Sequence, residues 1–563
     1  MDAFVADFHA YLTRDPNACV FKGIDARLDQ LPDPGAANID ARVDEGRALL
    51  ARADAMDSKG WDFDQALDLD LARLTLRASI LEDTWSFNGR TRAQQKPTAG
   101  DDIGDGLFLM FVNDPRPAAA RLDNILARIQ KVPIYLNRLL ERLDTPVKRW
   151  LQIDLEKVRE LPGLLGTLVS WAETEDWERL VELRVACDTA EQALADYCTA
   201  LEAMPTTEHF HLGRETAEAL VASRGIELSL DEIHRLAKRF LASNRDRVET
   251  LRQALVQRYE LDADLSVADT QAWLKKHYAV KVDPGQLEQV LDRYQAERER
   301  ILGWIRERDL FPVLDDQDMK IMRTPAFMAP SIPAGAMMPP PAFREGTRTS
   351  LVYLTLSEEL LDEHTEVEIP VMMIHEGIPG HHLQLATASV HPSTVRRHFD
   401  ALEHAEGWTT MLEDYMLDQG YMGELTDEAR YCGALDIARI GARVAIDLFF
   451  LTGDRAFLDV GIDCDLSSDD PFEAAGSLLQ AVTGFTPGRV QAELNWYSQE
   501  RGYPMCYLIG NHLVWSLKQD AQRANGDRRS AAQLDREFHR VYLQSGNMPV
   551  SFLRRVMAHE GLI

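Results

Sequence analysis

The stretch that decides the fold and the chemistry is Glu368–Ala386, EIPVMMIHEGIPGHHLQLA. Pro370 suits the first turn of a helix, where the missing N–H has no intrahelical partner to lose. The apolar run 371–374 would bury the start of that helix. Three histidines and a glutamate follow within the eight residues 375–382. This density favours a metal-binding helix over a proline-kinked core helix that holds the histidines by chance.

The histidine spacing differs from that of a regular zinc-binding helix. Such a helix places two histidines four residues apart on one face, and the glutamate after the first is the general base. Here Pro379 occupies the fourth position, and His381 lies about 9 Å from His375 along a straight helix. We expect Pro379, eased by Gly377 and Gly380, to kink the helix and absorb two residues. His381 would then become the second ligand.

His382 is the alternative second ligand. It lies seven residues after His375, on the same face of an undistorted helix but about 10.5 Å along it. We favour His381 over His382, because a kink at the proline brings the nearer histidine into reach. Glu376 directly follows His375 and is therefore the candidate general base in either case.

A third ligand is expected from the next long helix, predicted over 398–419. Glu403, Glu406 and Glu413 lie near one face of that helix, because they are three and seven residues apart. Glu406 stands among small and apolar residues, so we predict it as the ligand. Glu403 and Glu413 are alternative ligands, or groups that orient a ligand through a hydrogen bond. Gly407 would let this helix approach the metal helix closely.

The rest of the chain shows mainly helical periodicity. Helices are predicted over 64–86, 118–143, 146–176, 178–203, 229–258 and 285–308. Residues 310–345 are rich in Pro, Gly and Met, which predicts an extended loop. The alternating run TSLVYLTLS (349–357) predicts a short strand. We therefore expect a mainly α protein with a small β element next to the metal-binding helix.

Three segments organise this predicted fold. An N-terminal helical half covers 1–310, a Pro/Met/Gly-rich connector covers 311–348, and a metal-binding catalytic helical half covers 349–563. We expect the two halves to close around one shared cleft and to form one cooperative unit.

The net charge of the chain limits the classes of partner that we expect. The 563 residues include 61 basic and 91 acidic side chains, for a net charge of −30. Such a chain repels phosphate backbones and anionic lipid surfaces, so we expect neither a nucleic acid nor a membrane as partner. The N-terminus lacks the basic and apolar regions of a signal peptide, and no run approaches the roughly 18 apolar residues of a membrane span. We expect a cytoplasmic protein.

The motifs resemble the bacterial domain-of-unknown-function family 885. The resemblance rests on HEGIPGHHLQ (375–384) and on EGW (406–408), with weaker matches at 16–34, 212–215 and 538–549. That family is viewed as a gluzincin-like metallopeptidase group, similar to the all-helical zincins of the angiotensin-converting-enzyme type. The resemblance implies a large zincin-like fold in which His375, His381 and Glu406 hold one zinc ion and Glu376 is the base.

The C-terminal region departs from the family pattern. The family usually carries a Pro-Gly-Gln-Ala run before a Tyr and a Gly, whereas this chain reads ERGYPMCYLIG over 500–510. A tyrosine from this region faces the metal in related zincins. Tyr507 is therefore our candidate for stabilising the oxyanion, and Tyr503 is the second. Arg501 and Tyr503 are candidate substrate-binding residues, as is Tyr353 on the predicted strand, because edge strands can pair with a substrate backbone.

The function that we expect is zinc-dependent hydrolysis of amide bonds, most simply by a peptidase that acts on short peptides. The same ligands also suit Mn²⁺ or Fe²⁺. Two alternatives stay open at this point: an amidase for a small non-peptide molecule, and a non-catalytic metal-binding protein that keeps the helical shell. The altered run before Tyr507 supports the alternatives, and the intact pair His375–Glu376 supports the enzyme.

Overall fold

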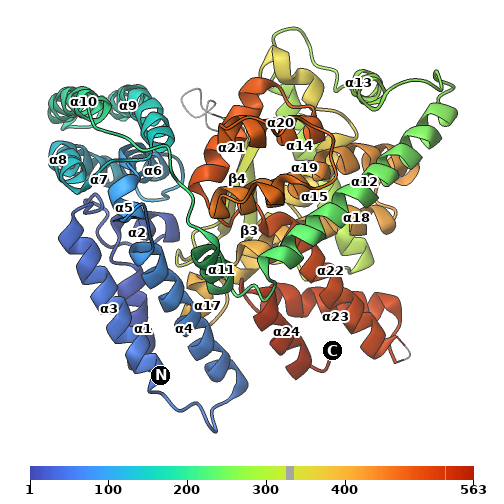
Figure 1. The fold of residues 1–563 in the computed structure, drawn as a ribbon, viewed down its shortest axis with the longest axis horizontal. Helices are drawn as coiled ribbons and strands as arrows, with labels where there is room; N and C mark the ends of the chain where they lie inside the picture. Colours follow the sequence, from blue (N-terminus) through green and yellow to red (C-terminus); the bar gives the residue numbers. More distant parts are fainter. Residues whose placement is uncertain (325–334, 527) are drawn as a thin grey trace. The chain divides into compact units, whose positions relative to one another are not determined.

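The computed structural model describes residues 1–324, 335–526 and 528–563, which are mainly helical, as predicted. The chain forms two compact units (Figure 1). Unit 1 comprises Met1–Leu212, Pro341–Glu345 and Pro392–His398, and unit 2 comprises Gly213–Pro340, Gly346–His391 and Phe399–Ile563.

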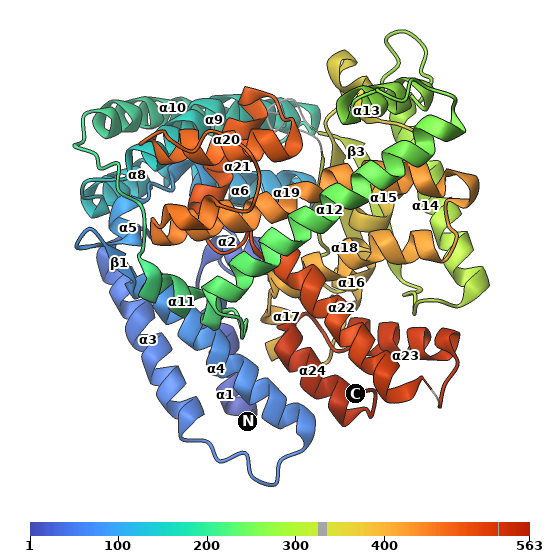
Figure 2. The ribbon, with the colours of Figure 1, turned by 45° about the vertical axis from the view of Figure 1, so that its right-hand side comes forward.

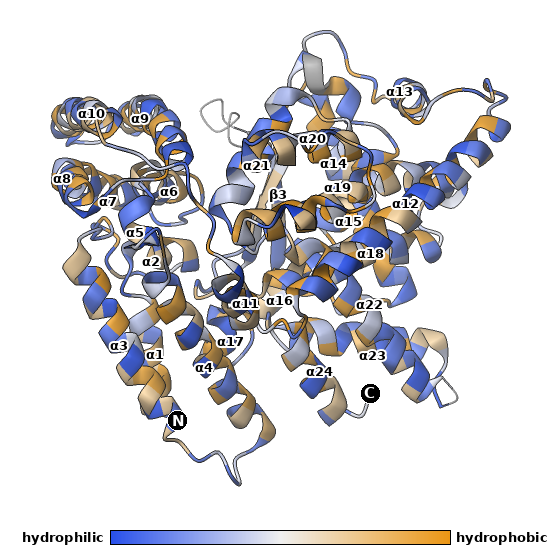
Figure 3. Ribbon diagram, in the orientation of Figure 1, coloured by the Kyte–Doolittle hydropathy of each residue, from blue (hydrophilic) through white to orange (hydrophobic). Residues whose placement is uncertain are grey.

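Unit 1 consists of helices and one small hairpin. Its elements are α1 (Asp2–Leu12), α2 (Pro16–Lys22), α3 (Ala36–Asp54), α4 (Phe63–Thr84), β1 (Ser86–Phe87), β2 (Arg90–Thr91), α5 (Arg92–Gln95), α6 (Ala99–Val112), α7 (Ala118–Ile129), α8 (Val132–Arg142), α9 (Lys148–Thr174), α10 (Leu180–Glu202) and α17 (Thr394–His398). Helix α3 packs against α4, and α10 against α8 and α9. Figure 3 shows the amphipathic stripes of α3 and α4, which turn apolar residues toward their neighbours.

Unit 2 contains the remaining elements. These are α11 (Arg214–Ser223), α12 (Leu230–Arg258), α13 (Val267–His277), α14 (Gln289–Arg308), β3 (Gln317–Arg323), β4 (Gly335–Met338), β5 (Arg348–Leu354), η1 (Glu358–Glu363), α15 (Glu368–Glu376), α16 (His381–Ser389), α18 (Leu402–Asp418), η2 (Gly423–Leu425), α19 (Thr426–Thr452), η3 (Arg455–Leu458), α20 (Pro471–Thr483), α21 (Pro487–Gln499), α22 (Cys506–Asn525), α23 (Ala531–Gln544) and α24 (Val550–His559). Within the described ranges, no helix combines the length and apolar character that crossing a bilayer would require.

The boundary between the units falls earlier than predicted. The sequence suggested a division near residue 310, but the compact units divide after Leu212. The reason is packing: α12 lies along α19, and α14 packs on α15 and β3. Figure 2 shows α12 beside α19. Residues 213–310 therefore pack with the other elements of unit 2, and α14 contacts α15, the helix that carries His375.

The predicted helices are present, with one division. The segment 118–143 forms two helices, α7 and α8, and Pro133 lies in the first turn of the second. Helix α12 begins after Ser229, whose hydroxyl accepts from the N–H of Glu232 while the Glu232 carboxylate accepts from Ser229, as a capping box does.

A three-stranded sheet lies partly inside the segment predicted as a loop. The strand order is β3-β5-β4, with β3 parallel and β4 antiparallel to β5. The prediction of β5 is confirmed, but β3 and β4 were missed within 310–345. Both strands lie between the prolines, and their hydrogen-bond partners are on β5, so no local period marks them. Part of the predicted connector, 325–334, lies outside the described residues.

The metal-binding helix is interrupted rather than bent. Helix α15 ends at Glu376 and α16 begins at His381. Gly380 is essential to the break, because a Cβ at this position would overlap the carbonyl oxygens of Ile374 and His375. The carbonyl of Pro379, which the break leaves without a helical partner, accepts a hydrogen bond of 2.9 Å from the indole N–H of Trp408. The predicted disruption at Pro379 is thus confirmed, and it is a break between two helices rather than a kink within one.

Helix α18 forms the core of unit 2. Every residue from Glu403 to Leu412 is buried, so this helix is not a surface helix with one solvated face. Gly407 was expected to allow close approach to the metal helix, but it faces α22 instead. A Cβ at Gly407 would lie 2.5 Å from the carbonyl carbon of Gly510, and a Cβ at Gly510 would overlap the carbonyl oxygen of Glu403. The two backbones are therefore in direct contact.

Because the two backbones touch, we expect one methyl group added at Gly510 to lower the stability of the fold strongly. Gly510→Ala would push α22 away from α18, at a cost on the order of 3 kcal/mol, because a backbone atom cannot rotate aside. Gly433→Ala is the matched control, since Gly433 lies within α19 and has no atom within 4 Å of an added Cβ. Urea unfolding followed by fluorescence should show a lower midpoint for Gly510→Ala only. An unchanged midpoint would refute the backbone contact.

Candidate metal centre

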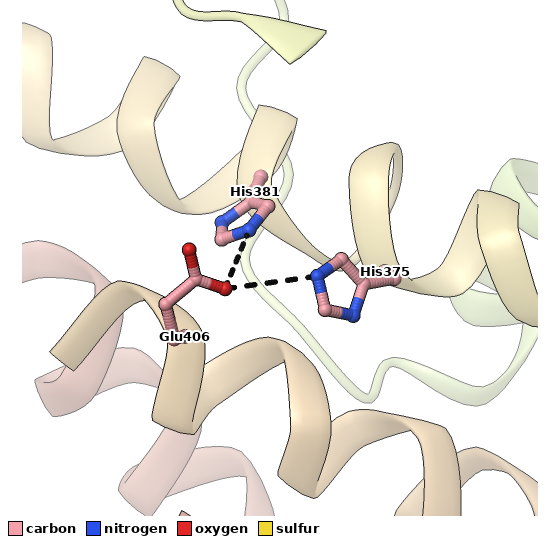
Figure 4. A group of neighbouring side chains, drawn as sticks. All are labelled: His375, His381 and Glu406. Carbon is pink, nitrogen blue, oxygen red and sulfur yellow. Dashed lines mark ion pairs between the residues drawn. The ribbon is translucent and has the colours of Figure 1, made fainter. Parts of the chain in front are cut away.

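Two histidines and a glutamate converge at the helix break. His375 lies at the end of α15 and His381 begins α16, and Figure 4 shows both rings turned toward the carboxylate of Glu406 from α18. One ligand atom from each residue lies within 4.8 Å of the other two. In the described part of the chain, this is the one group of at least three His, Cys, Asp or Glu with such spacing. We call these three residues the HHE cluster.

The cluster has the donor atoms of a cation site. Glu406 Oε2 lies 3.8 Å from His375 Nε2 and 3.4 Å from His381 Nε2. This oxygen is buried and accepts no hydrogen bond of acceptable geometry within the described structure. A buried carboxylate oxygen left unpaired is costly, and a cation between it and the ring nitrogens would satisfy it. Two imidazoles and a carboxylate are ligands that fit zinc.

Glu413 orients His375 from the side away from Glu406. Glu413 Oε1 lies 2.6 Å from His375 Nδ1, so the Nε2 of the same ring is left to face the cluster. Burial by itself lowers the pKa of His375, but the bond to Glu413 and the charges of the nearby glutamates raise it to about 9. A metal ion would therefore have to displace a proton from this ring. The predicted orienting role of Glu413 matches its position.

The carboxylate of Glu406 is held in its ionised form. Burial raises its pKa, but His381, His375 and a hydrogen bond from Tyr503 lower the pKa to about 2. The phenol of Tyr503 donates to Glu406 Oε1 over 3.0 Å. The two carboxylate oxygens thus have different partners: Oε1 receives the phenol, and Oε2 faces the histidines.

Tyr503, the second choice from sequence, is the tyrosine in hydrogen-bond contact with the cluster. Tyr507 stacks on it, with ring centroids 5.9 Å apart and planes within 6°. Burial and then the charge of Glu406 raise the pKa of Tyr503 well above its usual value, so its phenol keeps its proton at neutral pH. Tyr507, the first choice, is linked to Glu406 through Tyr503.

Two charged residues of α19 support the segment that carries both tyrosines. Asp447 accepts hydrogen bonds from the N–H groups of Gly502 and Met505, at 3.0 and 3.1 Å. The guanidinium of Arg443 lies 4.6 Å from the ring centroid of Tyr507. Sequence reasoning missed both residues. The available signal was the presence of two charges inside the apolar run IGARVAIDLFF (440–450), because a charge buried in such a run has a specific partner.

His382 and Glu403 point to other parts of unit 2. His382 is buried, with Nδ1 2.7 Å from Ser350 Oγ and with Nε2 against Gln317. Neither ring nitrogen is left open toward the HHE cluster, so His382 links α16 to the sheet. Glu403 accepts the N–H of Val550 at 3.2 Å, at the start of α24. Burial raises the pKa of Glu403 to about 7.

The remaining predicted residues occupy varied environments. Glu376 is the last residue of α15 and is half-buried, next to His375 in the chain. Tyr353 is buried in β5, and β5 is the central strand of its sheet, with β3 and β4 paired on either side. The expectation that this strand is an edge open to a substrate backbone is therefore wrong. Arg501 is buried, and its Nε donates to the carbonyl of Ser498 at 3.2 Å. The catalytic role of Glu376 and the substrate-binding roles of Tyr353, Tyr503 and Arg501 stay predictions.

Two solved structures share this fold over nearly the full length. One is described as a putative lipoprotein of unknown function from Shewanella oneidensis, with a TM-score of 0.77, 16% sequence identity, and coverage of 99% of this chain and 98% of that chain. The other, a putative lipoprotein from Colwellia psychrerythraea, has a TM-score of 0.80, 15% identity and the same coverage. Because both are described as lipoproteins, they contradict the predicted cytoplasmic location.

The family resemblance inferred from the motifs is confirmed. No curated protein matches the chain. A family model described as "Bacterial protein of unknown function (DUF885)" matches residues 16–557, a span that includes the HHE cluster and both tyrosines. The chain therefore belongs to the bacterial DUF885 family.

Proposed function

We propose that this protein is a zinc-dependent hydrolase of amide bonds that acts on short peptides. The observation that carries the proposal is the convergence of His375, His381 and Glu406, with a buried carboxylate oxygen that lacks a hydrogen-bond partner in the described structure. A site with three protein ligands leaves a coordination position for substrate chemistry, unlike a closed structural site. A third ligand from a following helix also agrees with the gluzincin-like resemblance.

The metal and the residues have separate tasks in this proposal. Zinc held at such a site polarises a carbonyl group and lowers the pKa of water. Glu376 accepts the proton of the attacking water and passes it to the leaving amine. Glu376 directly follows His375 at the end of α15, its charge acts on His375, and its half-buried position leaves it open to exchange with solvent. Glu413 keeps the Nδ1 proton of His375 in place, so that Nε2 can bind the metal.

Tyr503 is the group that we assign to the developing negative charge. Its phenol already lies at the HHE cluster, 3.0 Å from Glu406 Oε1, and it keeps its proton at neutral pH. A phenol has one proton to donate, so the O–H of Tyr503 would turn from Glu406 Oε1 to the oxyanion as negative charge develops there. Tyr507 holds the ring of Tyr503 in place by stacking.

The first prediction concerns metal content and the base. The purified chain should bind about one zinc ion, because the described residues contain one cluster of suitable donors. Glu376→Gln should retain the metal, measured by mass spectrometry of the eluted ion, and should lose hydrolysis of a peptide mixture by about 10²–10⁴-fold. Full activity of this variant would rule out Glu376 as the base.

The second prediction separates two buried glutamates. Glu413→Gln should weaken zinc binding by about 10–100-fold, measured by competition with a chromophoric chelator, because the orienting acceptor of His375 becomes weaker. Glu403→Gln is the matched control, since its carboxylate bonds to Val550 at the start of α24. Equal zinc affinity in both variants would contradict the orienting role of Glu413.

The third prediction ranks the two tyrosines. Tyr503→Phe removes the donor at the cluster and should lower kcat by about 10²–10³-fold, with zinc content unchanged. Tyr507→Phe keeps the stacked ring and should lower kcat by much less. A severe loss in Tyr507→Phe together with an active Tyr503→Phe would transfer the assigned role to Tyr507.

A further inference from the structure

The two histidines of the HHE cluster are held differently. On His375, Nε2 faces Glu406 and Nδ1 lies 2.6 Å from Glu413 Oε1. On His381, Nε2 lies 3.4 Å from Glu406 Oε2, but Nδ1 is buried and has no hydrogen-bond partner within the described ranges. A metal-binding histidine almost always donates its other ring N–H to an acceptor, which fixes the orientation of the ring. His381 therefore still requires an acceptor for Nδ1.

Gln384 has an acceptor atom that is not used. The residue is 1% exposed, and its Oε1 is buried without a donor in the part of the chain that the structure describes. A buried amide oxygen without a hydrogen bond is costly, so its presence calls for an explanation. Helix α16 begins at His381, and Gln384 follows less than one turn later. Side chains three residues apart are neighbours on a helix surface, with about 5–6 Å between their Cβ atoms.

The other polar side chains of α16 already have partners. The two ring nitrogens of His382 contact side chains of β3 and β5. The hydroxyl groups of Thr387 and Ser389 each donate over 2.7 Å to a backbone carbonyl of their own helix. Within α16, the unpartnered Nδ1 of His381 and the unpartnered Oε1 of Gln384 are therefore the donor and acceptor that remain for each other.

The position of the ring proton on His381 decides whether this pair can form. A neutral imidazole has one proton, which either nitrogen can carry. When Nε2 carries it, the N–H faces Glu406 Oε2, and Nδ1 has a lone pair but nothing to donate to Gln384. When Nε2 binds an ion through its own lone pair, the proton lies on Nδ1. Metal binding at Nε2 thus supplies the donor that the amide oxygen of Gln384 lacks.

We propose that Gln384 is a positioning residue of the metal centre, whose Oε1 accepts a hydrogen bond from Nδ1 of His381 when Nε2 binds zinc. Gln384 then does for His381 what Glu413 does for His375. A neutral amide adds no further negative charge to a site that already holds the carboxylates of Glu406 and Glu413. This inference rests on the metal binding in the proposed function, but it does not depend on hydrolysis.

Gln384→Met tests the acceptor, because methionine keeps the length of the side chain and has no amide oxygen. We expect the affinity for zinc, measured by competition with a chromophoric chelator, to fall about tenfold, as it does when a group that orients a metal ligand is lost. The thermal midpoint of the metal-free variant should not fall, since the oxygen that is removed has no hydrogen bond to lose in the described structure. A glutamine with a merely structural role would lower the thermal midpoint instead.

Two further variants complete the series. Gln384→Glu keeps an acceptor at this position and should bind zinc at least as tightly as the wild-type protein. Thr387→Val is the matched control, since the Thr387 hydroxyl lies three residues later on α16 and donates to the carbonyl of Leu383. The zinc affinity of this control should equal that of the wild-type protein.

Equal zinc affinity of Gln384→Met and the wild-type protein would overturn the inference. A Gln384→Glu variant that binds zinc as weakly as Gln384→Met would also overturn it, as would a clearly lower thermal midpoint of metal-free Gln384→Met, because either result indicates a role other than accepting a hydrogen bond from His381. A wild-type chain that binds no zinc would overturn both this inference and the proposed function. Hydrolysis by the zinc-loaded chain with no effect of Gln384→Met on affinity would refute the inference alone. The expected affinities without any hydrolysis would refute the proposed function alone.

Discussion

The burial of one ionised carboxylate organises the centre of unit 2. Glu406 is 4% exposed on a helix that is buried around its whole circumference, and charge in such a position needs compensation. The compensation comes from three directions: His375 and His381 at the break between α15 and α16, and Tyr503 from the segment before α22. The helix break, the supports of that segment and the close packing of α18 on α22 all keep these partners in place.

The extent to which sequence predicted this site depends on how local each interaction is. His375, His381 and Glu376 lie within seven residues, and Pro379 among them announced the disruption that brings the two histidines together. Glu406 was chosen from three glutamates because its neighbours are small and apolar. Tyr503 was ranked second because the family pattern pointed to Tyr507. The two tyrosines are four residues apart, and the local backbone conformation decides which ring reaches Glu406.

Contacts between segments far apart in the sequence could not be predicted from the local sequence pattern. Strand β3 has its partners on β5, about thirty residues later in the chain. The prolines before and after β3 indicate only where a strand can begin and end. Gly407 was correctly read as a close-approach position, but its partner is Gly510, about a hundred residues away, rather than the metal helix. The net charge of −30 counts every acidic residue alike, yet Glu403, Glu406 and Asp447 are buried and have structural partners.

The indole of Trp408 and the glycine contact between α18 and α22 have a consequence for the relation between folding and ion binding. Both hold the ligand-bearing elements by contacts between protein atoms, which do not depend on an ion. Small zinc domains differ, since the ion itself drives their folding. If the HHE cluster binds a metal ion as proposed, folding and metal acquisition are separable events in this chain. The supply of the ion would then set how many finished molecules are competent, without changing how many are folded.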